Sequence, residues 1–367
     1  MIIPKITDVY VSIDIEHPQA AKDLKKIAIF TKGNQESFKT YLMLEDVMAD
    51  FDVNTSVYKM AETIFSQDDA PEAIQVITYS DKAPAPMVSS NNGQVANDDV
   101  ATKFGAPASG IGRAAFDYFY NDWEIAIMAD YNKTDALALA DVIEHGGYDG
   151  KGFHFMLQQF GPSNASDHAE FDKYNRVWQF YHSNEDEYYV AGLASEATSA
   201  VVGQQSWKFV SDLNNVTPEE LNTAQIMDLE NQGFICYVTK GNHANQTDDK
   251  NKQGLYIDFI HGMDWVKATI ESNLQDALSL DGKKTFTFDA KGLGAVKTNL
   301  ETSLNEAGNN GIIATDSSNK YEYSYNVPDI SKIPQTHIDR RILDHIKFKY
   351  TASSAINEIH VNGTAVA

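Results

Sequence analysis

Hydrophobic residues follow two kinds of pattern along this chain, one typical of strands and one typical of helices. Together the two patterns predict a sheet covered by helices. Short apolar runs predict strands, and apolar residues spaced three and four apart predict helices. The predicted strands are residues 26–30, 73–79, 124–129, 153–157, 187–193, 234–239, 255–260, 321–327 and 346–350. The predicted helices are residues 44–51, 55–65, 114–120, 134–145, 217–232, 264–280 and 293–307. Strands and helices follow one another along the chain, which is typical of a mixed α/β fold.

Both ends of the chain carry a further alternating pattern that predicts a strand with one buried face. Such a terminal strand needs a partner, which can be a sheet of its own domain or of a neighbouring subunit. The alternating residues are Val9, Val11, Ile13 and Ile15 near the N-terminus and Ile359, Val361 and Ala365 near the C-terminus.

The pattern divides the chain into four predicted parts. Residues 1–20 and 353–367 are the N-terminal and C-terminal strand arms. Residues 21–212 form an N-terminal α/β region, and residues 213–352 form a C-terminal α/β core domain. Residues 80–112 are rich in Pro, Ser, Asn, Gly and Asp, which predicts a long surface loop within the N-terminal region.

Composition narrows the class of protein. The chain has 367 residues, 43% of them hydrophobic, which is enough for a substantial core. Its formal net charge of −23 disfavours nucleic acid and anionic membranes as partners. No signal-peptide pattern and no run of membrane-spanning length stands out, so we expect a soluble protein made in the cytoplasm.

A search for chemistry gives no catalytic residue, no metal site and no cofactor motif. The single cysteine, Cys236, lies in an apolar run and predicts a small buried hydrophobe. The glycine pairs at 110 and 112 and at 292 and 294 predict turns or close packing. No two histidines share a metal-ligand spacing beside a third ligand, so we expect His337 and His345 to be solvated or hydrogen-bonded surface residues. Residues 248–251 predict a solvated hairpin tip rather than a calcium loop.

Several blocks, in order along the chain, resemble the contractile tail sheath proteins of bacteriophages and phage-tail-like particles. The early blocks are Tyr41–Phe51 and Val57–Gln67, the second with a Phe-Ser-Gln ending. The middle block is Gly203–Phe209, followed by Asn215-Val216-Thr217, where the family more often has Gly in place of Asn. The late blocks are Ile338–Arg341, Ile346–Tyr350 and Ala355–Val361.

The resemblance implies a structural protein without enzymatic activity or cofactor. It implies an α/β core whose terminal strand arms enter the sheets of neighbouring subunits. Subunits would form stacked hexameric rings around a tail tube, and contraction would drive the tube through the host envelope. The partners implied are other copies of the chain, the tube protein, and the baseplate and terminator at the ends, without nucleic acid contact or membrane insertion. The implied location is the contractile tail of a virion, assembled in the host cytoplasm. A phage and a tail-like bacteriocin fit equally well.

Two charged pairs are candidate contact sites. Arg340 and Arg341, adjacent in an acidic chain, predict an inter-subunit ion pair. The resemblance also implies a helix of the C-terminal domain that faces the tube, and residues 289–307 with Lys291 and Lys297 are the candidate. Residues 264–280 are the second candidate for the helix that faces the tube.

Two other classes stay open at this point. One is an α/β hydrolase or transferase, which would show a pocket with perturbed titratable groups. The other is a different phage assembly protein, such as a tube or baseplate part, although tube subunits are typically small β-barrels.

Overall fold

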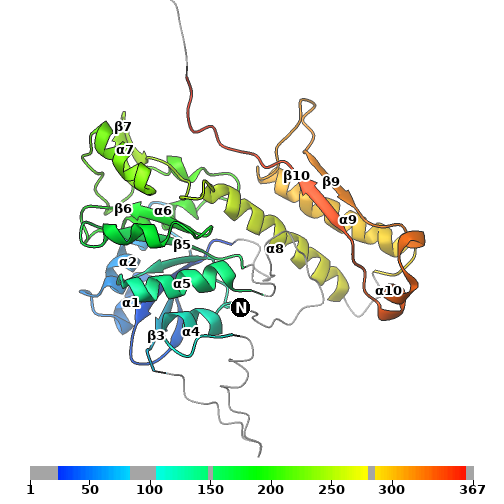
Figure 1. Ribbon diagram of the computed structural model, residues 1–367, viewed down its shortest axis with the longest axis horizontal. Coiled ribbons are helices and arrows are strands. Elements are labelled where there is room, and N and C mark those ends of the chain that lie inside the picture. The colour runs from blue at the N-terminus through cyan, green and yellow to red at the C-terminus, as the bar shows by residue number, and fades with distance from the viewer. Residues whose placement is uncertain (1–23, 83–104, 148–151, 280–285, 361–367) are drawn as a thin grey trace, which may run out of the picture.

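The computed structural model describes residues 24–82, 105–147, 152–279 and 286–360. It contains an eight-stranded sheet with the strand order β2-β3-β1-β4-β5-β6-β7-β8 (Figure 1). Neighbouring strands run parallel except at the edges, where β2 and β8 are antiparallel to their neighbours. The strands are β1 (Ile27–Lys32), β2 (Ser37–Tyr41), β3 (Ile74–Tyr79), β4 (Ile125–Met128), β5 (Phe155–Phe160), β6 (Val177–Tyr181), β7 (Phe234–Lys240) and β8 (His243–Gln246).

Helices cover both faces of this sheet, as Figure 1 shows. On one face lie α1 (Leu44–Asp50), α2 (Ser56–Phe65) and α6 (Tyr189–Ala197), and on the other lie α4 (Gly110–Asp117) and α5 (Lys133–His145). Strand β1 begins with four apolar residues, Ile27–Phe30, which are buried on both faces of the sheet. Ile27 and Ile29 enter the core with α2, whereas Ala28 and Phe30 enter the core with α5. A parallel strand buried on both faces reads as a continuous apolar run.

Helix α8 (Ile257–Ser279) connects the sheet to a smaller C-terminal unit, which we define as residues 286–352. Its first residues, Ile257 and Ile260, pack in the core shared with α6. Further along, Trp265 and Val266 pack in the core shared with α5, and Leu274 contacts the apolar cluster of the C-terminal unit. One helix therefore takes part in all three apolar clusters.

The C-terminal unit consists of α9 (Ala290–Asn309), β9 (Tyr323–Asn326), α10 (Gln335–Arg340) and β10 (Lys347–Tyr350). Strands β9 and β10 pair antiparallel as a separate two-stranded sheet. Alternate tyrosines hold the β9 segment on α9, because two strand residues span about 6.8 Å and four helix residues about 6.0 Å. The hydroxyls of Tyr321, Tyr323 and Tyr325 donate to side-chain oxygens of Asn309, Asn305 and Glu301 at 2.6, 2.8 and 3.3 Å.

Two predicted strands are wrong, and one predicted helix begins later than expected. Residues 187–193 do not form a strand, because Tyr189–Ala197 is helix α6, and it is buried nearly all round. Thr217-Pro218-Glu219-Glu220 does not begin a helix. Helix α7 (Thr223–Gln232) begins later, with a capping box between Asn222 and Gln225, and ends as predicted at Gly233 in the left-handed conformation. Residues 255–260 are not a strand, since α8 begins at Ile257.

Three strands of the sheet were missed by the pattern, namely β2, β6 and β8. The sheet also crosses the predicted domain boundary between residues 212 and 213, because β7 pairs with β6. Short 3₁₀ segments lie at η1 (Ala165–Glu170), η2 (Trp207–Phe209) and η4 (Ile330–Lys332). Among the described residues, no helix has both the length and the apolar character needed to cross a membrane.

Candidate assembly surfaces

The chain leaves the C-terminal unit after β10 as an extended segment. The amide of Ala314 donates to the carbonyl of Thr351 at 2.9 Å, and the amide of Ser353 donates to the carbonyl of Ile312 at 2.8 Å. Beyond these bonds the segment runs away from the unit (Figure 1), and residues 353–360 form no strand. Ile356 and Ile359 are 72% and 79% exposed. The segment therefore displays two large apolar side chains that its own fold leaves in solvent.

A side-chain hydrogen bond connects this segment to the loop between β8 and α8. The side-chain amide of Asn357 donates to the Asp249 carboxylate at 3.0 Å. Burial raises the pKa of Asp249 to about 6, Asp258 adds to the rise, and the bond from Asn357 opposes it. The predicted solvated hairpin tip at residues 248–251 is wrong here, because Asp249 and Asn251 are both buried.

Most of the predicted arm residues lie outside the described part of the chain. These are Val9, Val11, Ile13, Ile15, Val361 and Ala365. The partner of each arm therefore stays a prediction.

The two-stranded sheet of the C-terminal unit has edges that could receive an added strand. Within the described residues, β9 pairs along its length with β10 alone, and β10 with β9 alone. Unpaired N–H and C=O groups on such edges are a template for another chain.

The two predicted arginines lie at the end of α10. Both are exposed, and Arg341 ends the helix with φ 60 in the left-handed conformation. Neither forms an ion pair with a carboxylate of the described residues. The inter-subunit ion pair stays a prediction, and the two cations are accessible for it.

The two predicted tube-facing lysines lie on α9, although on different sides of it. Lys291 is exposed and Lys297 is partly buried. Six residues place them roughly 120° apart around the helix axis. The opposite stripe of Val296, Leu300 and Leu304 is buried, as the sequence predicts.

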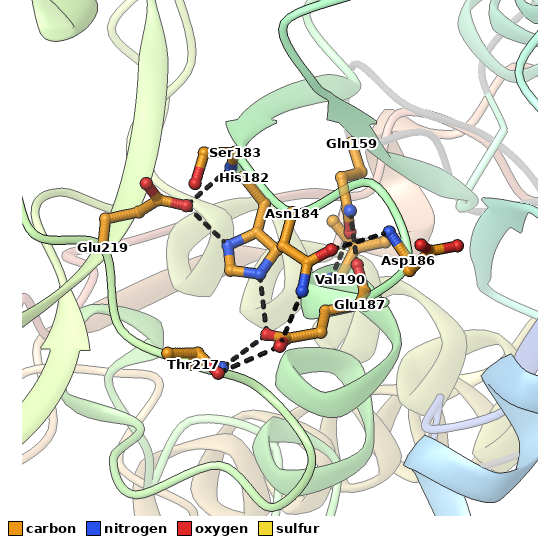
Figure 2. A network of polar contacts seen from close by, with 9 residues as sticks. All are labelled: Gln159, His182, Ser183, Asn184, Asp186, Glu187, Val190, Thr217 and Glu219. Atoms are coloured by element: carbon orange, nitrogen blue, oxygen red, sulfur yellow. Dashed lines mark hydrogen bonds and ion pairs between the residues drawn. The ribbon is translucent and has the colours of Figure 1, made fainter.

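A buried ionic cluster holds the edge of the main sheet (Figure 2). His182, which follows β6, is 1% exposed and lies between two carboxylates. Its Nε2 is 3.0 Å from Glu187 Oε2, and its Nδ1 is 2.9 Å from Glu219 Oε1. Carboxylates close to both ring nitrogens favour the protonated, positively charged imidazole. The arrangement therefore fits a histidinium between two carboxylates.

Backbone and side-chain donors complete this cluster. Glu187 accepts from the amide and hydroxyl of Thr217 at 2.6 and 2.9 Å, and from the side chain of Asn184 at 2.9 Å. Glu219 accepts from the amide of Ser183 at 2.6 Å. The cluster therefore joins the loop after β6 to the segment before α7, as Figure 2 shows.

The pKa shifts follow from these contacts. Burial lowers the pKa of His182, but the hydrogen bonds to Glu219 and Glu187 outweigh burial and leave it above 6.5. Burial raises the pKa of Glu187, but bonds from Thr217 and His182 leave it below 4.5. Burial likewise raises the pKa of Glu219, but bonds from His182 and Ser183 leave it lowered. All three shifts favour the charged cluster.

A second buried ion pair joins α8 to the sheet. Arg176, just before β6, makes two parallel bonds of 2.8 Å to the carboxylate of Asp264. Its guanidinium also donates to the carbonyl of His154 at 3.0 Å. Both side chains are buried, so the pair fixes α8 on the sheet from inside the core.

The features sought for an enzyme give little support to catalysis. Cys236 is buried as predicted, and burial raises the pKa of its thiol to about 12, which disfavours a thiolate. A Cβ at Gly292 would lie 2.1 Å from the amide nitrogen of Thr287, which confirms close packing there. His337 and His345 are at the surface, as expected, but the sequence search missed that they come together with Asp344.

Comparison with known proteins places the fold. No family model and no curated protein sequence matches this chain. A chain of the anti-feeding prophage (AFP) baseplate in the contracted state matches with a TM-score of 0.65 and 10% identity, covering 99% of this chain and 98% of that one. A chain of the sheath complex of the extracellular contractile injection system PVC, in the contracted state, gives 0.63 and 12%, with the same coverage. The sheath tail protein of Desulfitobacterium hafniense gives 0.54 and 11%, covering 94% and 96%.

These matches extend over almost the whole of both chains. The protein therefore has the α/β fold of contractile-sheath proteins, and the fold class predicted from the sequence is confirmed. The resemblance seen in the sequence blocks points to the same group of structures.

Proposed function

We propose that this chain is a structural subunit of a contractile sheath and has no catalytic role. The observation that carries the proposal is the match to chains of contractile injection systems along nearly the full length of both chains. A chance likeness between α/β domains would cover the common sheet and leave the C-terminal unit unmatched.

In this proposal, copies of the chain polymerise as stacked hexameric rings around an inner tube. The terminal arms add strands to neighbouring subunits, and the free edges of β9 and β10 are candidate acceptors. Burial of one isoleucine side chain contributes about 1.5–3 kcal/mol, so Ile356 and Ile359 would strengthen each junction appreciably. Contraction would move the α/β bodies as rigid units while the arms keep them connected.

The finer contacts are part of the same proposal. Arg340 and Arg341 would meet carboxylates of a neighbouring subunit. Lys291 would face the tube in the extended state, with Lys297 reaching it from the adjoining side of α9. The particle would be a phage tail or a related injection system, with a baseplate and a terminator at its ends.

Electron microscopy of the purified full-length chain tests the function. We expect striated tubes or sleeves with a central lumen. A chain that stays monomeric at high concentration, at several salt concentrations and with the tube protein present, would refute the sheath role.

A pair of matched variants tests the C-terminal arm. Deletion of residues 356–367, or Ile359→Asp, should leave a folded chain that no longer polymerises, because the apolar face of the arm is lost. Val53→Asp changes another exposed apolar residue and serves as the control, which should polymerise. If the deletion unfolds the chain, as judged by circular dichroism, the arm belongs to its own core instead.

A further inference from the structure

Two imidazoles and one carboxylate meet at the end of the C-terminal unit. His337 lies on α10, and Asp344 and His345 lie in the turn that leads to β10. Asp344 Oδ1 is 2.9 Å from His337 Nδ1 and 3.5 Å from His345 Nε2. One ligand-type atom from each residue lies within 4.8 Å of the other two.

These separations suit a shared metal ion. Imidazole nitrogens and carboxylate oxygens bind Zn²⁺ at about 2.0–2.2 Å, which places neighbouring ligand atoms roughly 3.0–3.5 Å apart. Both distances from Asp344 Oδ1 are close to this range. The side chain of His345 is 71% exposed, so it is free to rotate until its ring nitrogen lies at a similar distance from that of His337.

The backbone brings the three ligands together from two segments. Arg341 ends α10 with φ 60, which turns the chain back beside the helix. The apolar cluster of the C-terminal unit takes up Ile338, Leu343 and Ile346, the residues that immediately flank the ligands. Packing on the inner side therefore fixes the backbone from which His337, Asp344 and His345 reach the surface.

We propose that His337, Asp344 and His345 bind one divalent transition-metal ion, for which Zn²⁺ is the best fit. Two nitrogens and one oxygen suit Zn²⁺ and its neighbours in the first row, whereas Ca²⁺ and Mg²⁺ prefer oxygen ligands alone. The exposed position leaves the remaining coordination sites to water. A bound ion would connect α10 to the segment that leads into β10. The C-terminal arm begins just after β10.

Zinc titration of the tag-free, full-length chain against a chromophoric chelator tests this site. We expect one saturable Zn²⁺ per chain, which a large excess of Mg²⁺ does not displace. His345→Asn should weaken binding at least tenfold, since Asn is a poor ligand yet tolerates the left-handed φ of 60 at this position. Asp344→Asn should weaken binding by a similar factor.

Asp339→Asn is the matched control. Asp339 lies on the same short helix and pairs with Gln335 at 2.8 Å, away from the three ligands. This variant removes the same charge as Asp344→Asn, and its affinity should stay within twofold of the wild type. The proposal is overturned if the wild type shows no saturable binding near one ion per chain. It is equally overturned if His345→Asn binds as tightly as the wild type, or if Asp339→Asn is as weak as Asp344→Asn.

Discussion

The ionic cluster at His182 gives a prediction in which mutation and pH act on the same contacts. We expect His182→Gln to destabilise the chain, because Gln supplies no positive charge to the two carboxylates. Loss of one partner from a buried charge pair costs about 3–5 kcal/mol. Glu187 keeps its three other hydrogen bonds and Glu219 keeps its bond from Ser183. We therefore expect the free energy of unfolding to fall by an amount at the lower end of that range, about 3 kcal/mol.

The sign of the pH dependence follows from the three pKa shifts. The pKa of His182 is raised above 6.5, so its stabilising contribution is complete below pH 6.5 and is lost as pH rises through the raised value. The pKa values of Glu187 and Glu219 lie below 4.5, so their contribution is complete above pH 4.5 and is lost as pH falls through the lowered values. The stability difference between wild type and variant should therefore be largest between pH 4.5 and 6.5 and should shrink on both sides.

Urea denaturation of both proteins at a series of pH values measures this difference. A double-mutant cycle with Glu219→Gln separates the pair from the rest of the cluster, and we expect a coupling of at least about 1.5 kcal/mol for a charge-assisted bond. A difference that stays constant between pH 4 and pH 9 would show that His182 is not charged, and the reasoning would fail.

Three more perturbations follow from single contacts. Asp264→Ala leaves the guanidinium of Arg176 buried without its partner and should cost about 3–5 kcal/mol in urea denaturation, whereas an apolar replacement of both residues should recover most of that loss. Gly203→Ala should destabilise the chain by more than about 1 kcal/mol, because φ is +97 and the new Cβ would lie 2.4 Å from a side-chain carbon of the segment after α9. The double substitution Arg340→Glu and Arg341→Glu should leave the fold intact, since both arginines are exposed. It should impair polymerisation in sedimentation assays. Normal polymerisation of that variant would remove the inter-subunit ion pair.

The sequence predicted those elements whose burial pattern is regular. Helix α2 shows this, because Val57, Met60 and Ile64 form one apolar stripe, as predicted. The pattern failed at α6, where all of the first seven residues are buried, so the sequence looks like that of a buried strand. A short apolar run does not distinguish the two structures by periodicity alone.

Local capping signals failed where a distant residue competes for the same side chain. Thr217 and Glu220 have the spacing of a capping box, but the helix begins only at Thr223. The Thr217 hydroxyl instead donates to Glu187, thirty residues earlier in the chain, and the neighbouring Glu219 lies 2.9 Å from His182 Nδ1. The contacts that decide this segment connect different parts of the fold, so no local rule could reveal them.

The metal-ligand spacing rule failed for a related reason. His337 and His345 are eight residues apart, a spacing that would place them far from one another on a continuous helix. The left-handed residue Arg341 ends α10 after six residues and reverses the chain, which brings Asp344 beside His337. A search that allowed for a helix end between the two histidines would have found the cluster.

The arms show a different limit of sequence reasoning. An alternating apolar pattern states that a strand needs a partner, but both a sheet of the same chain and a sheet of a neighbour satisfy that need. In the described part of this chain, Ile356 and Ile359 remain in solvent, at a hydrophobic cost of about 1.5–3 kcal/mol each relative to burial. Within the described residues, hydrogen bonds hold this segment to its own fold only as far as Ser353 and through Asn357. The free energy of burying the two isoleucines is therefore gained only when another surface covers them. The exposed isoleucines therefore favour a partner outside the chain, which is the property that a polymerising subunit requires.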